Sequence, residues 1–373
     1  MVIQMEKYYL AALQMAGGIG CAQLGRLLLA FGTAEAVWRA AAAELEQGGL
    51  EHTLAVQLAA FCRQDEARPQ RIAESCQKQK VSLCTLRDPE YPILLKQIYN
   101  APQVLFYRGC LQADCSRLAM VGSRMASNYG KGVAEQLAAE LASHDITIVS
   151  GAARGIDTAA HLGAMQKGRT AAVLGCGIDV VYPPDNAELL AAIAESGVVL
   201  SEYAPGTPPL PVFFPARNRI ISGLASGTIV VEAAEKSGSL ITAEFALSEG
   251  RDVFAVPGSI YSGTSRGCHR LIQQGAKLVT GSADILEEYG AASGKKGAAR
   301  RNAQELPEMS AEEAAIYQIL SWERPLSMDE VIYKLHGNTS NTAFLLLQME
   351  LRGLVTENES HAYTRSAVKE GIL

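Results

Sequence analysis

The chain has 373 residues, of which 48% are apolar and 19% are charged, and its formal net charge is −6. This length favours two or three domains, and the composition is typical of a folded globular protein with a sizeable core. The negative net charge argues against a strongly electrostatic nucleic-acid binder, so any positive surface must be local.

The N-terminal stretch MVIQMEKYYL contains no long apolar segment, and no run of about 18 apolar residues occurs in the chain. We therefore expect no signal peptide and no membrane span, and we predict a cytoplasmic protein. The eight cysteines are scattered without a CxxC pair, which favours reduced thiols. No Cys/His cluster has the spacing of zinc ligands, so no metal is expected.

Residues 1–75 are predicted to form a helical domain, with Gly-Ile-Gly at 18–20 between two short helices. This turn resembles that of a helix-hairpin-helix, whose backbone N–H groups can meet phosphate. An ordinary αα-corner has the same pattern, and the sequence leaves both open. Residues 76–116 contain Pro89, Pro92 and Pro102 and are predicted to be an extended connector.

The pattern changes at residue 117, where short apolar runs begin to alternate with helical stretches. The predicted strands are 118–121, 146–150, 170–175, 198–202, 228–234, 252–258 and 277–280. The predicted helices are 130–143, 156–166, 186–196, 216–225, 239–249 and 267–274. Continuous apolar strands that alternate with helices indicate an α/β domain over 117–289, with a Rossmann-like, doubly wound and mainly parallel sheet.

Residues 290–308 are small, Gly/Ala-rich and basic, which is typical of a linker. After them, Ser310 is predicted to cap a helix with Glu313 closing a capping box. The remainder of 309–373 predicts helix, turn, helix and a hairpin, which is the pattern of a winged helix.

Glycine-rich or basic turns follow most of the predicted strands. In an open parallel sheet these turns meet at one edge, where ligands bind. Glycines permit close backbone approach, helix N-termini supply N–H groups, and hydroxyls add neutral donors. The cations at the predicted turns are Arg124, Arg154, Arg217, Arg219 and Lys236. Over 117–289 there are only 13 Lys/Arg against 17 Asp/Glu, so the positive charge would be concentrated at this edge.

The sequence carries no obvious means of breaking a bond at this edge. GxxxxGK[ST] and GxSxG are absent, and GxGxxG does not follow the first strand of the α/β domain. Asp157 and Glu232 lie near the predicted edge, where we expect them to organise loops rather than transfer protons. We therefore predict a site that binds a row of phosphates, with no catalytic residue and no cofactor.

The motifs VGSR (121–124), SGAARGIDTAAH (150–161), LGCGIDVVYPP (174–184), FPARNRIISGL (214–224), EAAEKSGSLITA (232–243) and VPGS (256–259) resemble those of the DNA-processing protein A family (DprA/Smf). The segment 267–286 is similar to the closing segment of that family. The resemblance implies a non-enzymatic protein of natural transformation that binds and protects incoming single-stranded DNA and loads the RecA recombinase. It also implies a homodimer formed through the α/β domain, and single-strand-binding protein as a further partner. For residues 1–75 it implies a helical domain of sterile-alpha-motif or hairpin type.

The resemblance also implies which residues line the single-strand groove, with Phe214 either stacking on a base or belonging to the core. These residues are Gly122, Ser123, Arg124, Ser150, Gly151, Arg154, Gly155, Phe214, Arg217, Asn218, Arg219, Lys236, Ser237, Gly238 and Ser239.

Two other functions remain open at this point. A phosphoribohydrolase-like enzyme that processes nucleotides shares a similar sheet, but it carries a PGGxGT loop where this chain has EAAEKSGSLITA. The second alternative is a scaffold that binds proteins and no nucleic acid. The C-terminal region 308–373 has five Lys/Arg against ten Asp/Glu, and its second predicted helix is poor in cations. We expect that region to contact protein more than DNA, or to stabilise the dimer.

Overall fold

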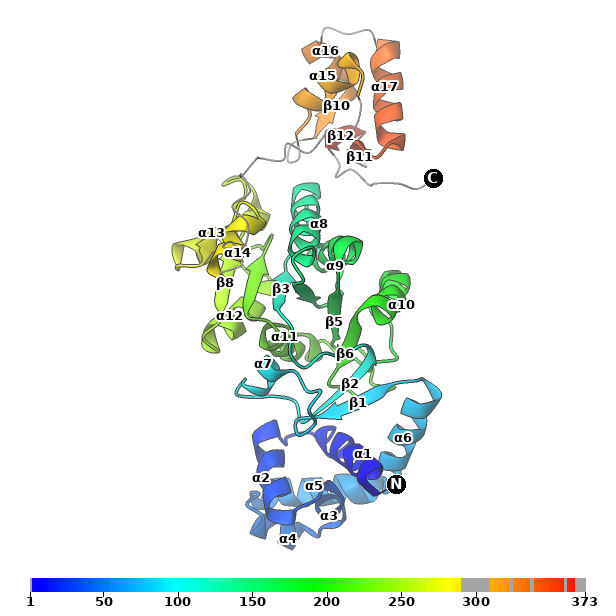
Figure 1. Ribbon diagram of the computed structural model, residues 1–373, viewed down its shortest axis with the longest axis vertical. Coiled ribbons are helices and arrows are strands. Elements are labelled where there is room, and N and C mark those ends of the chain that lie inside the picture. The colour runs from blue at the N-terminus through cyan, green and yellow to red at the C-terminus, as the bar shows by residue number, and fades with distance from the viewer. Residues whose placement is uncertain (1, 290–308, 322–324, 336–338, 359–360, 366–373) are drawn as a thin grey trace.

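The computed structural model describes residues 2–289, 309–321, 325–335, 339–358 and 361–365 (Figure 1). The predicted linker 290–308 lies outside the described residues. Three parts follow one another along the longest axis of the molecule: an N-terminal helical unit, an α/β core and a C-terminal unit (Figure 1).

The N-terminal unit is a cluster of short helices packed around buried Leu13, Leu24, Trp38 and Leu58. Its helices are α1 (Val2–Gln14), α2 (Cys21–Phe31), α3 (Ala34–Arg39), α4 (Ala42–Gln47), α5 (His52–Gln64) and α6 (Arg68–Lys78). The Gly-Ile-Gly turn joins α1 to α2, and the Gly20 N–H donates to Gln23 Oε1 at 2.9 Å. The predicted helical turn therefore forms, while its contact with phosphate stays a prediction.

The segment predicted to be a connector is part of the sheet instead. It contributes β1 (Ser82–Thr85), the short helix α7 (Ile93–Lys96) and β2 (Val104–Gly109), with β1 antiparallel to β2 and β2 antiparallel to β6. Val104, Leu105 and Phe106 are fully buried, which drives β2 into the sheet. The three prolines lie outside both strands, because proline cannot donate to a strand ladder.

The core sheet has nine strands in the order β1-β2-β6-β5-β4-β3-β7-β8-β9. From β6 to β9 every neighbouring pair is parallel, which confirms the predicted sheet. The remaining strands are β3 (Arg117–Val121), β4 (Thr147–Ser150), β5 (Thr170–Leu174), β6 (Val198–Ser201), β7 (Gly227–Val230), β8 (Asp252–Ala255) and β9 (Lys277–Leu278). Strands β4 to β6 extend from one side of β3 and β7 to β9 from the other, so the winding direction reverses at β3 and β7.

Helices cover both faces of the sheet. One face is covered by α8 (Asn128–Ala142), α9 (Ile156–Lys167), α10 (Ala187–Ser196) and α14 (Ser282–Glu288). The other face is covered by α7, α11 (Phe213–Leu224), α12 (Ser239–Ser248) and α13 (Arg266–Gln273). Two short 3₁₀ turns, η1 (Pro184–Asn186) and η2 (Gly263–Ser265), lie in the loops. Alternate residues of one strand serve the two faces, as Leu118 and Ala119 of β3 do.

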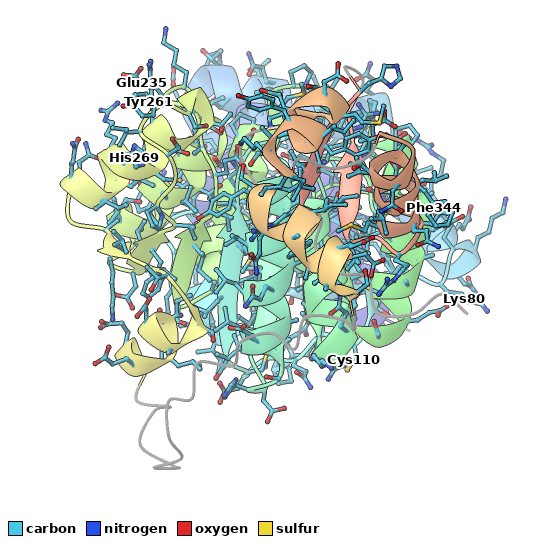
Figure 2. All side chains as sticks on the ribbon, turned by 90° about the horizontal axis from the view of Figure 1, so that it is seen from above. Lys80, Cys110, Glu235, Tyr261, His269 and Phe344 are labelled. Atoms are coloured by element: carbon cyan, nitrogen blue, oxygen red, sulfur yellow. The ribbon has the colours of Figure 1, made fainter. Side chains whose placement is uncertain are left out.

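The C-terminal unit contains α15 (Ala311–Ile319), β10 (Leu326–Ser327), α16 (Met328–Leu335), α17 (Thr339–Leu351), β11 (Val355–Glu357) and β12 (Ala362–Arg365). Its strands form an antiparallel sheet in the order β10-β12-β11, and the winged-helix assignment of this unit stays a prediction. Ser310 Oγ accepts from the Glu313 N–H, and Glu313 accepts from the Ser310 N–H, so the predicted capping box forms. Phe344 lies at the outer side of α17 (Figure 2).

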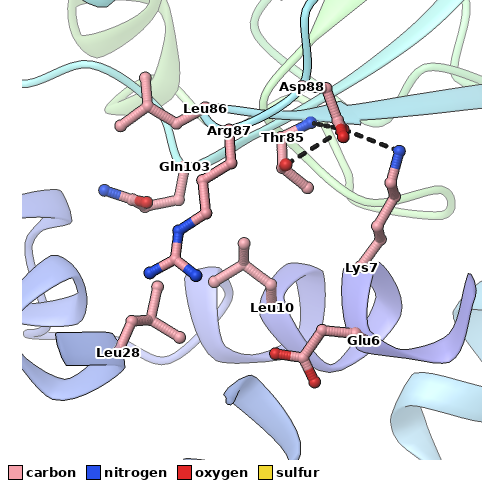
Figure 3. Close-up of a pocket in the computed structure, with 9 residues that line it drawn as sticks. All are labelled: Glu6, Lys7, Leu10, Leu28, Thr85, Leu86, Arg87, Asp88 and Gln103. Carbon is pink, nitrogen blue, oxygen red and sulfur yellow. Dashed lines mark hydrogen bonds and ion pairs between the residues drawn. The ribbon is translucent and has the colours of Figure 1, made fainter. Parts of the chain in front are cut away.

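The N-terminal unit meets the core at a hollow of about 200 Å³ between α1, α2 and the segment after β1 (Figure 3). Lys7 Nζ lies 2.7 Å from Asp88 Oδ2, and this carboxylate also accepts from the backbone N–H of Thr85. Gln14 on the same helix donates to the carbonyl oxygens of Val104 and Glu202. The polar contacts of Lys7 and Gln14 therefore attach α1 to the core. No helix among the described residues is long and apolar enough to cross a membrane.

Candidate nucleic-acid interface

The loops after β3, β4 and β7 are bonded to one another at the carboxyl edge of the sheet. The Ser123 N–H donates to the Glu232 carbonyl oxygen at 2.7 Å, and the Ile156 N–H donates to the Ser123 carbonyl oxygen at 3.2 Å. These loops flank the point between β3 and β7 where the winding direction reverses, which is where open α/β sheets bind ligands. The predicted convergence of the loops on one edge is therefore present.

The loop 150–155 is tightly shaped. Ala152 has a φ of 53° and Gly155 a φ of 81°, both in the left-handed region. A Cβ atom at Gly151 would lie 2.6 Å from the Arg217 guanidinium, so a larger residue there would displace that buried group. The Asp157 carboxylate accepts from the N–H groups of Gly151 (3.1 Å) and Ala153 (3.3 Å), which holds the loop against the start of α9.

Arg217 lies beneath this loop and not on its surface. Only 4% of the residue is exposed, and its guanidinium donates to the carbonyl oxygens of Gly151 (2.8 Å) and Val173. Burial raises the pKa of the Asp157 carboxyl, and the Arg217 charge together with the two backbone N–H groups opposes that shift. The prediction that Arg217 contacts the ligand is therefore corrected. The buried Arg217 side chain connects the ends of β4 and β5 inside the domain.

Three predicted cations remain at the surface of the edge. Arg124 and Lys236 are exposed and make no ion pair with any residue that the structure describes. Arg154 is also exposed, with 63% of its side chain accessible, and lies 2.7 Å from Asp185. An exposed ion pair of this kind is weak, so Arg154 can exchange Asp185 for a phosphate at little cost.

An aromatic pair adjoins these cations. Phe214 lies in the first turn of α11 and is half-buried, and its ring centroid lies 5.2 Å from that of Tyr182. The Arg124 guanidinium carbon is 5.6 Å from the Phe214 centroid, within the range of a cation–π contact. Phe214 therefore belongs to the edge, where π-faces and positive charge lie side by side. This combination suits unpaired bases on a phosphate backbone.

Other predicted residues have structural roles. Arg219 forms an ion pair with Glu202 at 2.6 Å, and both side chains are about nine-tenths buried, so it adds little charge to the edge. Ser150 is fully buried and donates to the Met120 carbonyl oxygen. Asn218 donates to the Gly238 carbonyl oxygen at 3.3 Å and so joins α11 to the loop after β7.

The loop after β7 also contains the predicted hydroxyls. Ser237 Oγ and Ser239 Oγ lie 2.8 Å apart, and Ser239 begins α12 with 8% of its surface exposed. Gly238 is exposed, and Gly122 after β3 is half-buried. The structure thus places the glycines and hydroxyls of the two loops at the same edge as Arg124.

Glu232 has a structural role. It is 3% exposed and accepts from the N–H and the hydroxyl of Ser127, the cap of α8, at 3.1 Å and 2.8 Å. The residue therefore organises the start of α8 through Ser127. Asp157 likewise organises its loop.

Among the described residues, no group of three His, Cys, Asp or Glu side chains could hold a metal, and all eight cysteine thiols are free.

Sequence reasoning missed three residues of this edge, all in the loop after β5. Tyr182 packs on Phe214, Asp185 pairs with Arg154, and Asn186 donates to the Ala152 carbonyl oxygen at 2.9 Å. The available signal is YPPDN, a turn sequence that follows a predicted strand. This turn contains no cation, so its composition alone does not indicate a phosphate site.

Comparison with known proteins identifies close relatives. A family model described as DNA recombination-mediator protein A matches residues 82–290. The DNA processing protein DprA of Streptococcus pneumoniae is 52% identical over 213 residues, which cover 57% of this chain and 75% of that protein. Protein Smf of Synechocystis is 33% identical over an alignment that covers 96% of this chain and 99% of that protein.

Two solved structures are similar as well. The crystal structure of DprA from Streptococcus pneumoniae superposes with a TM-score of 0.66 at 42% identity, covering 76% of this chain and 97% of that one. DprA from Helicobacter pylori, whose structure is reported for its single-stranded DNA binding mode, gives a TM-score of 0.52 at 28% identity. That match covers 57% of this chain and 97% of the other.

Proposed function

Because the chain belongs to the DNA recombination-mediator protein A family, we propose that it binds single-stranded DNA along the carboxyl edge of its parallel sheet. The observation that supports this most is the position of exposed Arg124 beside the Phe214–Tyr182 pair, at the point where the sheet reverses its winding. The cation meets phosphate, and the rings stack on bases that a duplex would keep paired.

The proposed groove has a surface layer and a supporting layer. Arg124, Arg154, Lys236, Phe214 and Tyr182 form the surface that meets the strand. The loop glycines allow the backbone to come close to phosphate. The supporting layer is buried and does not touch DNA. It consists of Arg217, Asp157 and Glu232, whose hydrogen bonds hold the loops in place.

We propose further that the chain breaks no bond in its ligand. The alternative of a phosphoribohydrolase-like enzyme needs a free acid at the edge, and Glu232 is its candidate. This carboxylate is buried and already accepts from the Ser127 N–H and hydroxyl, which argues against a catalytic role. Release of ribose phosphate from a nucleotide, abolished by Glu232→Gln, would overturn this part of the proposal.

The partners proposed for the complex follow from the family. A protein that covers single-stranded DNA without cutting it suits the protection of incoming strands in the cytoplasm and the loading of the RecA recombinase. Single-strand-binding protein then competes for the same strand or binds beside it.

We also propose a homodimer formed through the α/β core. Strand β9 lies at the end of the sheet with an open edge, and Leu278 in it is 44% exposed. Leu247 of α12 is 55% exposed, and it lines a hollow of about 290 Å³ together with Lys277 of β9. An open strand edge with exposed apolar side chains is a surface that proteins usually cover.

The test of the DNA site is charge reversal at the edge, with Arg124→Glu and Arg154→Glu combined. We expect the affinity for fluorescent oligo-dT, measured by anisotropy at 0.1 M salt, to fall by at least about tenfold, because two attractive phosphate contacts become repulsive. The slope of log affinity against log salt should decrease by about 0.7 for each phosphate that the protein no longer neutralises.

The matched control reverses two exposed lysines away from the edge, with Lys96→Glu and Lys167→Glu combined. It changes the net charge by the same amount, so a general loss of electrostatic attraction would weaken both variants alike. Equal binding by the Arg124/Arg154 variant and the wild type would place the groove elsewhere.

A further inference from the structure

Helix α17 has two apolar faces, and the proposed DNA site uses neither of them. One face of this helix packs in the C-terminal core, where Leu345 is 9% exposed and Leu346 and Met349 are fully buried. On the opposite face, Phe344, Leu347 and Leu351 are 56%, 54% and 80% exposed. Their spacing of three and four residues places them in one line along the helix, which we call the α17 stripe (Figure 2 shows Phe344).

The chemistry of this stripe does not suit DNA. In a helix-turn-helix the second helix presents Arg, Lys, Asn or Gln to base edges and phosphates. From Thr339 to Leu351, α17 contains no Lys or Arg. The next cation, Arg352, donates to Glu313 Oε1 at 2.7 Å. The exposed surface of α17 therefore combines the apolar stripe with the amides of Asn341 and Gln348, and it carries no free positive charge among its described residues.

Acidic side chains flank the stripe at both ends. Glu312 accepts from Asn341 Nδ2 at 3.0 Å, one turn before Phe344. At the other end, Glu350 accepts from the Glu357 N–H at 3.4 Å. Burial raises the pKa of the Tyr363 phenol, and the charges of Glu357 and Glu350 raise it further.

We propose that the α17 stripe is a docking surface for a basic amphipathic helix of a partner protein. Apolar side chains at a spacing of three and four residues would cover the stripe, and Lys or Arg at their edges would meet Glu312 and Glu350. A second copy of this chain does not fit, because its own stripe would bring acidic side chains against acidic side chains. This surface is independent of the proposed DNA site.

The probe is a fluorescein-labelled model helix of leucine and lysine, with leucines at the same spacing, titrated with the full-length protein. A matched helix of leucine and glutamate tests the charge requirement. We expect the lysine helix to bind more tightly and Leu351→Asp to weaken its binding by at least about tenfold, since an apolar contact is replaced by a charge. Phe344→Asp, in the same stripe, should have the same effect.

The control is Leu29→Asp on α2, because Leu29 has the same exposed fraction of 80% as Leu351. It should leave peptide binding unchanged. Combining Glu312→Lys with Glu350→Lys should reverse the preference between the two helices. Each variant is checked for an unchanged circular dichroism spectrum and melting temperature.

Four results would overturn the proposal. The glutamate helix could bind as tightly as the lysine helix, or Leu29→Asp could weaken binding as much as Leu351→Asp. Loss of self-association by Leu351→Asp in sedimentation would make a second copy the occupant. A tenfold loss of oligo-dT affinity in that variant would make the stripe a DNA surface.

Discussion

Two arginines of this protein show how environment decides the role of a residue. Arg124 and Arg217 both occur in basic motifs that contain glycine, and the sequence predicts that both meet the ligand. Arg124 is exposed beside Phe214, whereas Arg217 is buried and donates to two carbonyl oxygens. The first is suited to contact, and the second shapes the loop that makes contact.

We therefore predict opposite outcomes for the same substitution at the two sites. Arg217→Met should lower the free energy of unfolding by about 3–5 kcal/mol, because it removes the buried positive charge that favours the Asp157 carboxylate and leaves two carbonyl groups without their donor. Arg124→Met should change stability by less than about 0.5 kcal/mol and weaken oligo-dT binding.

Urea unfolding and DNA titration on the same preparations separate the two effects. A stable Arg217→Met variant that had lost DNA binding would show that this buried arginine reaches the ligand after all.

At the scale of the element, α9 carries two polar side chains into the core. Asp157, in its first turn, organises the loop 150–155, and His161 lies one turn later, fully buried. Thr170 donates its hydroxyl to the Ile148 carbonyl oxygen, so His161 Nδ1–H must donate to Thr170 Oγ1 at 2.6 Å. Its Nε2 is left without a partner among the described residues, and the ring is neutral.

This histidine should make stability depend on pH. Burial lowers the pKa of His161 to about 3, and the Arg217 charge adds to the shift, whereas in the unfolded chain the ordinary value is about 6.5. Between these values only the unfolded state binds the proton, so stability is lost as the pH falls. Well below pH 6.5 the loss should be about 1.4 kcal/mol per pH unit, and it should total about 2 kcal/mol between pH 6.0 and 4.5.

Urea unfolding at the two pH values measures this loss. The His161→Met variant should lose about 2 kcal/mol less than the wild type over the same interval, because its side chain does not titrate. The exposed His144→Met is the matched control and should behave as the wild type does. An unchanged pH dependence in His161→Met would mean that the native ring can accept a proton.

At the scale of the whole molecule, charge and apolar surface are unevenly distributed. The exposed cations of the proposed groove lie at one edge of the core, while the C-terminal region has twice as many acids as bases. Polar contacts of α1 attach the N-terminal unit to the core, and the exposed apolar residues of β9 and α12 lie at the far end of the sheet. Each surface thus suits a different class of partner.

This distribution predicts that the C-terminal unit is dispensable for DNA affinity. A truncation to residues 1–305 should bind oligo-dT within about threefold of the full chain, because an acidic unit contributes few phosphate contacts. Gel shift measures the affinity, and sedimentation checks that self-association persists. A drop of more than about tenfold with an intact dimer would assign the unit a direct role on DNA.

The proposed dimer makes a prediction at the same scale. Leu278→Glu and Leu247→Glu should each weaken self-association by at least about tenfold in sedimentation equilibrium, since a charge would be buried at the interface. Leu162→Glu on α9 is the control, because Leu162 is 47% exposed but lies on another face. Equal effects of all three would exclude the β9 edge as the interface.

The sequence by itself determined the order of strands and helices in the core, the capping box at Ser310 and the sheet edge at which the loops converge. Apolar periodicity and caps are local properties, and parallel strands bring their following loops to one edge by geometry alone. The sequence did not reveal that 82–85 and 104–109 join the sheet, because strand pairing depends on distant partners.

Only the tertiary structure decided which charges of the candidate site reach solvent. Arg217, Arg219 and Arg124 lie within motifs of similar composition, yet one is buried under a loop, one is paired with Glu202 and one is exposed. Tyr182 entered the site through packing on Phe214, which no local pattern indicates. The direction and burial of a side chain depend on the elements packed around it, so neither can be predicted from the residue type alone.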